Sequence, residues 1–185
     1  RAEIVTQETL RAADEAVSRP LLLWAHYMDP HDPYDAPDTP RDQHAYVTEA
    51  TMAGKTASGS SMRRRFLDAY HAEIEYYDRW LGHLVEGLKQ RGLWDSSIVV
   101  FWSDHGEEFW DHGQVEHGHS LYDELLRVPL MIHLPGQNES QRISNPVSLL
   151  DVMPTILDLC NVQIPEGCDG RSLRPCMTGS GDQIE

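Results

Sequence analysis

The segment from Ile98 to Ser120, IVVFWSDHGEEFWDHGQVEHGHS, places many metal-capable side chains directly after an apolar run. Asp104 and His105 are consecutive at the end of that run, and a bend at Gly106 would let both side chains reach one divalent cation. Mixed oxygen and nitrogen ligands suit Mn or Zn somewhat better than Ca. Two ligands do not complete a metal site, so a solvated Asp-His turn remains the alternative.

Further histidines and acids follow within the same segment. His117 and His119, in EHGHS, could each be a metal ligand, a general acid or a surface residue. Glu107 and Glu108 could orient ligands from outside the coordination shell, although a structural or solvated role is the simpler interpretation. His112, in DHGQ, is expected to be solvated.

A second histidine-bearing segment, MDPHDPY, contains His31. Its prolines would form a rigid frame that holds one imidazole still. The aspartates of this segment resemble a calcium loop only superficially, because the prolines and the missing glycine break the EF-hand pattern. Asp29 and Asp32 could instead form turns.

Hydrophobic periodicity predicts the elements that must position these residues. Helices are expected over residues 3–18, 63–90, 120–126 and 154–160, and strands over 21–27, 97–102 and 129–134, with 147–150 as a further strand candidate. Gly92 is expected to end the long helix and Ser120 to cap a short one. Residues 36–61 would form a variable loop, and residues 161–185 a tail that is mostly coil.

Alternating strands and helices predict an α/β fold with a mostly parallel sheet sandwiched by helices. In such sheets ligands bind beyond the carboxyl ends of the strands. The loops that carry His31 and His105 follow two of the predicted strands. We therefore expect both loops to contribute to one site.

The composition limits the class of protein. The chain has 185 residues, which suits one domain, and a formal net charge of −15, which disfavours nucleic acid and anionic membranes as partners. No apolar run has the length of a membrane-spanning helix. The spacing of Cys160, Cys168 and Cys176 fits no usual zinc pattern, so unpaired thiols are expected, with a Cys168–Cys176 disulfide as the alternative.

Four blocks of the chain, in order, resemble the sulfatase family of the alkaline phosphatase-like superfamily. The blocks are LLLWAHYMDPHDPYDAP, AYHAEIEYYDRWLGHLVEGLKQRGLWDSSIVVFWSDHGEE, HGHSLYDELLRVPLMIHLPG and DVMPTILDLCNVQIPEGCDGRSL. The resemblance implies that residues 1–185 are the C-terminal part of one catalytic domain of the alkaline phosphatase-like fold. The start at Arg1, without Met, agrees with a missing N-terminal part, so the sequence leaves targeting and compartment open.

The resemblance also implies a role for individual residues. Asp104 and His105 match a pair of metal ligands, with Ca the metal expected for the family and Mn or Zn as alternatives. His31 matches the histidine that contacts the sulfate or phosphate group. His117 lies thirteen residues after Asp104, where relatives place a Lys or His beside the leaving-group oxygen, and that spacing favours it over His119. The implied substrate is a sulfate ester of a small molecule or a saccharide.

The chain departs from the family at the nucleophile. Sulfatases use a formylglycine made from Cys or Ser in a Cys/Ser-x-Pro-x-Arg motif, near a first Asp-Asp metal pair, and neither motif occurs here. We therefore expect an upstream formylglycine in the whole protein and no turnover by residues 1–185 alone. A phosphodiesterase, a phosphonate monoester hydrolase or a phosphoethanolamine transferase of the same superfamily is the alternative. A non-catalytic module that binds metal or a partner is the alternative of another class.

Overall fold

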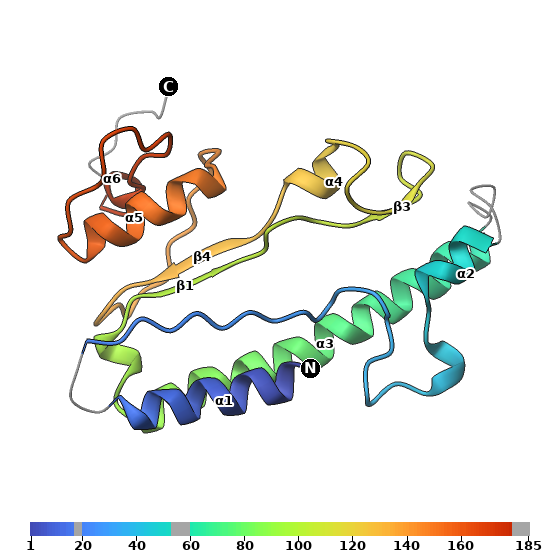
Figure 1. Cartoon of the computed structure of the whole chain (residues 1–185), viewed down its shortest axis with the longest axis horizontal. Helices are drawn as coiled ribbons and strands as arrows, with labels where there is room; N and C mark the ends of the chain where they lie inside the picture. The colour runs from blue at the N-terminus through green and yellow to red at the C-terminus, as the bar shows by residue number, and fades with distance from the viewer. Residues whose placement is uncertain (17–19, 53–59, 179–185) are drawn as a thin grey trace. The chain divides into compact units, whose positions relative to one another are not determined.

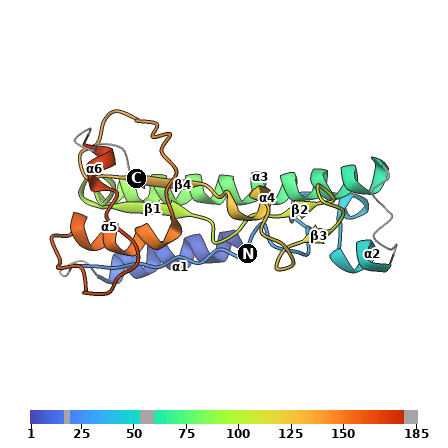
Figure 2. The same cartoon turned by 90° about the horizontal axis from the view of Figure 1, so that it is seen from above.

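The computed structural model describes residues 1–16, 20–52 and 60–178 and divides the chain into two compact units. The first unit contains residues 1–94 and 105–128, and the second begins with residues 95–104 and continues from residue 129. Figures 1 and 2 together label the α-helices and strands of both units, with β2 labelled in Figure 2. The first unit contains all four histidines that the sequence proposes for chemistry, namely His31, His105, His117 and His119, so it is described first.

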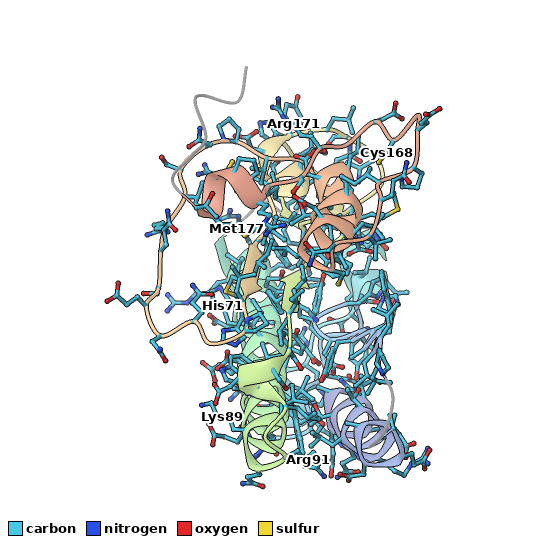
Figure 3. The ribbon with its side chains drawn as sticks, turned by 90° about the vertical axis from the view of Figure 1, so that its left-hand side faces the viewer. His71, Lys89, Arg91, Cys168, Arg171 and Met177 are labelled. Atoms are coloured by element: carbon cyan, nitrogen blue, oxygen red, sulfur yellow. The ribbon has the colours of Figure 1, made fainter. Side chains whose placement is uncertain are left out.

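Two helices form the frame of the first unit. Helix α1 spans Ala2–Glu15 and lies beside α3, which spans Ser60–Gln90 (Figures 1 and 2). At the end of α3, the Arg91 guanidinium forms an ion pair with Asp14, with Nε 2.7 Å from Oδ1. Figure 3 shows Arg91 at this end of the helix. Both helices therefore agree with the predicted ones within a few residues, and positions 17 and 18 of the first prediction lie outside the described residues.

The predicted stop at Gly92 is confirmed. Gly92 has a φ of +66°, the left-handed region that glycine adopts without a steric penalty. Its N–H donates to the carbonyl of Lys89, and the N–H of Leu93 donates to the carbonyl of Leu88, each at 2.9 Å. These two bonds satisfy carbonyls that the end of the helix would otherwise leave without a partner.

Charged side chains hold the base of the His31 loop. The Arg1 guanidinium donates to Glu73 Oε1 at 3.2 Å, and the same oxygen accepts the N–H of Asp35 at 2.8 Å. Arg1 also lies 3.5 Å from a carboxylate oxygen of the buried Asp29. Burial raises the pKa of Glu73, and the Arg1 guanidinium opposes that rise. The loop is therefore tied at both flanks to the middle of α3.

The rest of this loop is fixed by its own backbone. Tyr34 and Ala45 exchange two backbone hydrogen bonds, each of 3.0 Å, and the N–H of Val47 donates to Asp32 Oδ1 at 2.8 Å. Asp32 therefore ties the loop to a residue 15 positions further along the chain. The predicted variable loop contains two short helices, η1 over Arg41–Gln43 and α2 over Val47–Met52, and residues 53–59 of it lie outside the described part.

An aromatic cluster forms the core beneath the loop. Tyr34 and Phe66 are fully buried, with ring centroids 6.1 Å apart. Phe66 meets Trp110 at 5.5 Å, and Tyr70 meets Phe109 at 5.0 Å. These edge-on and tilted contacts join α3, the His31 loop and the chain that follows His105.

Strands β2 (Glu108–Phe109) and β3 (Val115–Glu116) form an antiparallel hairpin around a buried carboxylate. Glu108 has no exposed surface and accepts hydrogen bonds from the N–H groups of His112 and Gln114, at 3.0 and 2.8 Å, and from His119 Nε2 at 2.8 Å. Desolvation works to raise the pKa of Glu108, but these bonds together lower it below its ordinary value. The ionised carboxylate therefore holds the hairpin together.

The short helix α4 spans Asp123–Leu126 and packs against the turn at Gly106. The N–H of Gly106 donates to the carbonyl of Leu125 at 2.8 Å, and the N–H of Glu107 to that of Glu124 at 3.0 Å. A Cβ on Gly106 would lie 2.0 Å from the Glu124 carbonyl oxygen. Glycine is therefore required here for close backbone approach as well as for the bend that the sequence suggests.

The prediction that Ser120 caps this helix is wrong. The helix begins three residues later, with Tyr122 at the N-cap position and no capping side chain. Its start is set by the backbone pairing with residues 106 and 107, which fixes the carbonyls of Glu124 and Leu125. Tertiary contacts of this kind override a local capping preference.

The second unit is built on one strand pair. Strand β1 (Val99–Trp102) pairs antiparallel with β4 (Leu130–His133), with Val99 opposite His133 and Trp102 opposite Leu130. The remaining elements are η2 (Trp94–Ser96, where the units join), η3 (Leu149–Asp151), α5 (Val152–Leu159) and α6 (Arg174–Met177). The predicted strands around β1 and β4 and the helix around α5 are confirmed.

Buried side chains connect the C-terminal segment to α5. Thr155 Oγ1 accepts the N–H of Leu173 at 2.9 Å, and the buried Asp151 accepts the N–H of Arg171 at 2.9 Å. The three cysteines are free thiols, as expected. Figure 3 labels Cys168, Arg171 and Met177 in this part of the chain. Within the described residues of the predicted coil tail, α6 is the one helix, and residues 179–185 lie outside the described part.

Two predicted strands are absent from the described residues. The segment 21–27 belongs to no strand ladder, and Leu22 and Trp24 are 86% and 73% exposed. An apolar run forms a strand only where a neighbouring strand pairs with it, and no described strand does so here. Residues 149–151 are helical because the side chains of Ser148 and Asp151 form a capping box. Both strand pairs in the described chain are antiparallel, so the expected parallel pairing is not found among them.

No helix among the described residues is long and apolar enough to cross a bilayer.

Substitution of Gly106 tests the close approach of the turn to α4. In the protein that contains this chain, Gly106→Ala should lower the free energy of unfolding by about 1–3 kcal/mol, because the new Cβ overlaps the Glu124 carbonyl. Gly82→Ala is the control, since a Cβ at that helical position meets nothing within 4 Å, and we expect a gain of up to about 1 kcal/mol. Thermal unfolding of the two variants measures the difference, and equal midpoints would contradict the packing.

Substitution of Glu108 tests the buried carboxylate through pH. Because folding lowers the pKa of Glu108 below its ordinary value of 4.5, the ionised group stabilises the fold above that pH. This contribution is lost as the pH falls through the lowered pKa. Glu108→Gln should cost roughly 1–3 kcal/mol near neutral pH and show a smaller further loss in acid. Unfolding followed from neutral to acidic pH checks this, with the exposed Glu139→Gln as the control expected to match the unsubstituted protein.

Candidate active site

Three of the histidines proposed from the sequence meet in the first unit. The ring of His117 lies 5.4 Å from that of His31 and 4.0 Å from that of His105, measured between centroids. His31 comes from the loop held by Arg1 and Glu73, His105 from the turn before β2, and His117 from the residue after β3. The loops that the sequence expects to share a site are therefore adjacent in this unit.

Backbone carbonyls orient two of these rings. His31 Nδ1 lies 2.7 Å from the carbonyl oxygen of Asp32, and His105 Nδ1 lies 2.8 Å from that of Gly106. A carbonyl only accepts, so each Nδ1 carries the proton and a neutral ring has its lone pair on Nε2. Nε2 is then the atom through which His105 can bind a metal or His31 can meet a substrate.

A carboxylate orients the third ring. His117 Nδ1 lies 3.1 Å from Glu107 Oε1, and the hydroxyl of Tyr34 donates to Glu107 Oε2 at 2.9 Å. The Glu107 side chain is 6% exposed, and Tyr34 is fully buried. Burial, reinforced by the Glu107 charge, raises the pKa of Tyr34 far above its ordinary value. The hydroxyl therefore stays protonated and serves as a donor.

The other two histidines of the segment have different surroundings. His119 Nε2 is bonded to Glu108, so this ring belongs to the hairpin. His112 was expected to be solvated, but its ring stacks on Tyr122 with centroids 3.4 Å apart, and its Nδ1 bonds to Glu124. A half-exposed ring gains dispersion contact and a charged partner in this position, which explains why it does not extend into water.

The proposed metal ligands account for only part of a coordination shell. Asp104 is exposed and ends the first segment of the second unit, while His105 begins the continuation of the first unit. Within the described ranges, no group of three or more His, Cys, Asp or Glu side chains has the arrangement of a metal site. A carboxylate and an Nε2 lone pair are suitable donors for a divalent cation, so the two residues fit the role of partial ligands.

Backbone strain is concentrated between the hairpin and His117. Trp110 and Glu116 have φ values of 60° and 79°, in the left-handed region that side chains other than glycine adopt at a cost. Trp110 is held by its packing on Phe66, and Glu116 directly precedes His117. Such strain persists only where surrounding contacts determine the conformation, and it is frequent at functional sites.

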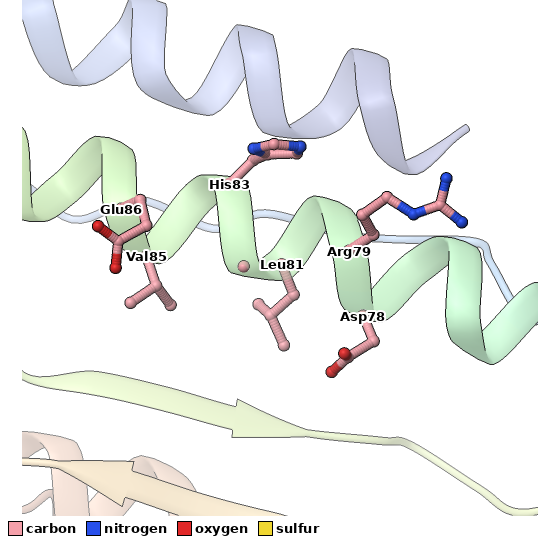
Figure 4. Close-up of a pocket in the computed structure, with 7 residues that line it drawn as sticks. Asp78, Arg79, Leu81, His83, Val85 and Glu86 are labelled. Carbon is pink, nitrogen blue, oxygen red and sulfur yellow. The ribbon is translucent and has the colours of Figure 1, made fainter.

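A shallow hollow on the first unit lies away from these histidines. Figure 4 shows the residues that line it, which all belong to α3 between Asp78 and Glu86, with His83 and Leu81 on opposite sides of the helix. One helix supplies both the apolar and the charged side chains, and none of the proposed site residues is among them. The hollow therefore does not add to the candidate site.

Sequence reasoning missed Tyr34, and it left the role of Glu107 open. Both contribute to the site through the hydrogen bonds that fix His117. The available signal was Tyr34 itself. An aromatic residue in a polar, proline-rich loop suggests that its ring is buried against the rest of the protein. The Arg1–Glu73 contacts were also missed, because their partners lie 72 residues apart in the chain.

Comparison with known proteins identifies the family. The family model "Sulfatase" matches residues 2–162. The chain is 38% identical over 114 residues to "Arylsulfatase K" of Xenopus laevis, an alignment that covers 62% of this chain and 21% of that protein. The chain therefore spans about a fifth of the length of this curated relative.

Solved structures agree with this comparison. The phosphonate monoester hydrolase SpPMH from Silicibacter pomeroyi matches with a TM-score of 0.78 and 26% identity, over 100% of this chain and 44% of that one. The protein Ps i-CgsB, solved in complex with k-i-k-neocarrahexaose, matches with a TM-score of 0.71 and 25% identity, over 98% and 39%. The chain belongs to the sulfatase family, and thereby to the alkaline phosphatase-like superfamily. It forms part of the α/β domain of that superfamily.

Proposed function

We propose that the protein containing this chain hydrolyses sulfate esters. The observation that carries the proposal is the meeting of His31, His105 and His117 in one unit of a sulfatase-family chain. Imidazoles that are cationic or hydrogen-bonded stabilise the negative charge that develops on sulfate oxygens during ester cleavage. A cluster of three histidines held by backbone and carboxylate partners is suited to that task.

Each residue has a distinct role in this proposal. Asp104 and His105 are two of the ligands of a divalent metal, with Ca expected and Mn or Zn as alternatives. When bound, the metal neutralises charge on the sulfate group. His31 contacts a non-bridging oxygen through Nε2. His117 protonates or stabilises the leaving-group oxygen, because its Nδ1 is occupied by Glu107 and its Nε2 is the remaining polar atom.

The nucleophile lies outside this chain in the proposal. Cys160, Cys168 and Cys176 are followed by Asn-Val, Asp-Gly and Met-Thr, so none stands in a Cys/Ser-x-Pro-x-Arg motif. We propose an upstream formylglycine and expect residues 1–185 alone to be inactive.

The proposed substrate is a sulfated saccharide or a small sulfate ester. One structural neighbour binds a carrageenan oligosaccharide, which supports a saccharide. The net charge of −15 makes nucleic acid an unsuitable partner. Residues 36–61, between the His31 loop and α3, are the proposed source of specificity.

A phosphonate monoester hydrolase is the second candidate. The likeness to SpPMH extends over 100% of this chain, and the same three histidines could act on a phosphorus centre. A phosphodiesterase, a phosphoethanolamine transferase and a non-catalytic metal- or partner-binding module stay as further alternatives.

The direct test is an assay of the whole protein with added Ca or Mn. The substrates are 4-nitrophenyl sulfate, bis(4-nitrophenyl) phosphate and 4-nitrophenyl phenylphosphonate. A kcat/KM that is greatest for the sulfate supports the proposal, and one that is greatest for the phosphonate or the diester favours the second candidate. Metal binding without turnover of any ester would point to the non-catalytic module.

Substitution of His117 tests leaving-group assistance. His117→Ala should lower kcat for phenyl sulfate by roughly 100-fold or more, within the usual range for general acid–base catalysis. The loss should be smaller for 4-nitrophenyl sulfate, because nitrophenolate leaves with little help. His119→Gln is the comparison, since His119 bonds to Glu108, and we expect no such dependence on the leaving group. Equal losses for both esters in His117→Ala would contradict the role.

Substitution of the metal ligands tests the partial shell. Asp104→Asn and His105→Gln should each weaken Ca binding by roughly 10-fold or more, which calorimetry on the metal-free protein can measure. Asp95→Asn is the control, because Asp95 is an exposed aspartate at the other end of the β1 segment. Unchanged Ca affinity in both ligand variants would remove these residues from the metal site.

A further inference from the structure

Glu107 is bonded through both of its oxygens to different residues. Oε1 lies 3.1 Å from His117 Nδ1, and Oε2 accepts the Tyr34 hydroxyl at 2.9 Å. With 6% of the side chain exposed, water competes little for these bonds. The carboxylate therefore has one orientation that satisfies both partners, and that orientation determines where His117 stands.

Tyr34 cannot move independently of the core. Its backbone exchanges two hydrogen bonds with Ala45, and its ring meets Phe66 at 6.1 Å and Phe109 at 6.0 Å. These contacts leave the buried ring little rotational freedom, so the hydroxyl is a fixed donor. The position of the Glu107 carboxylate is thus set by the aromatic core.

The adjacent glutamate–histidine pair, Glu108 and His119, is bonded in a different way. Glu108 bonds to His119 through Nε2, whereas Glu107 bonds to His117 through Nδ1. Nε2 of His119 is therefore occupied by Glu108, whereas in His117 it is Nδ1 that bonds to a glutamate. Of the two adjacent glutamates, one closes the hairpin and the other orients a ring that touches both His31 and His105.

We propose that Tyr34 and Glu107 are positioning residues that hold His117 with Nδ1 toward Glu107 and Nε2 toward the leaving-group oxygen. This inference rests on the proposed function. Neither Tyr34 nor Glu107 touches the substrate. They act by fixing the ring and by keeping the proton on Nδ1, so that Nε2 meets the ester in one orientation.

Tyr34→Phe is the sharpest test, because it removes one oxygen and leaves the ring in place. In the whole protein, kcat for phenyl sulfate should fall roughly 10-fold, with KM within about twofold, the size usual for partners that orient a functional side chain. The fall for 4-nitrophenyl sulfate should be smaller. Glu107→Gln, which keeps the shape of the side chain and removes its charge, should give the same pattern with a greater loss.

Tyr70→Phe is the matched control. Tyr70 belongs to the same aromatic cluster, with its ring 5.6 Å from that of Tyr34, and the Glu107 charge contributes to raising its pKa, but among the described residues the hydrogen bond to Glu107 comes from Tyr34 and not from Tyr70. We expect kcat for both esters to stay within about twofold of the unsubstituted protein. Equal kcat values in Tyr34→Phe and Tyr70→Phe would overturn the inference.

A second measurement does not depend on turnover. With ¹⁵N-labelled histidine, NMR should report His117 as the Nδ1-protonated tautomer in the unsubstituted protein, and a shift of that population in Glu107→Gln. An unchanged His117 signal in Glu107→Gln would overturn the inference. A protein that turns over no sulfate ester but shows this change would remove the proposed function and leave the fixed orientation of His117 intact.

Discussion

Burial of two consecutive carboxylates is the constraint on which the site depends. The side chains of Glu107 and Glu108 are 6% and 0% exposed, and an ionised group removed from water is costly unless donors surround it. The chain supplies those donors from separate places. Tyr34 and His117 bond to Glu107, while His119 and two backbone N–H groups bond to Glu108. The loops that meet here are therefore the loops that satisfy these two charges.

The irregular segments are rigid because a regular element supports each of them. Helix α3 provides Glu73, which binds the base of the His31 loop, and Phe66, which packs against Tyr34 and Trp110. The turn at Gly106 packs against α4 and is bonded to it through backbone hydrogen bonds. Side chains in loops can hold catalytic geometry only when their backbones are fixed in this way. The three histidines thus lie in loops, and helices support those loops.

The sequence predicted best where the signal is local. The long apolar periodicity of residues 63–90 and the glycine at position 92 determine α3 and its end from side-chain spacing alone. The run at 21–27 has the same apolar character as a buried strand, but strand formation depends on a partner that the run does not encode. The two strand pairs among the described residues are antiparallel, and their pairing too depends on neighbouring strands.

The candidate site was predictable in its residue types and not in its connections. Histidines after apolar runs, and the resemblance to the sulfatase family, identify His31, His105 and His117. Their roles stay predictions until the variants are measured. Nothing in the order of residues says that Tyr34 meets Glu107 across 73 positions, or that adjacent glutamates choose different histidines. Such pairings follow from packing and from the need to satisfy buried charge, which only three-dimensional proximity reveals.

The two glutamate–histidine bonds span ten and eleven residues along the chain, and both cross the same hairpin. The two bonds therefore constrain the number of residues in the hairpin. A substitution on the outer face of the hairpin leaves both lengths intact, whereas the loss or gain of a single residue between Glu108 and His117 changes both at once. Each carboxylate would then face the wrong part of the chain. Evolution can therefore change the chemistry of this loop by replacing residues, but it can change the length of the loop only by rebuilding the site.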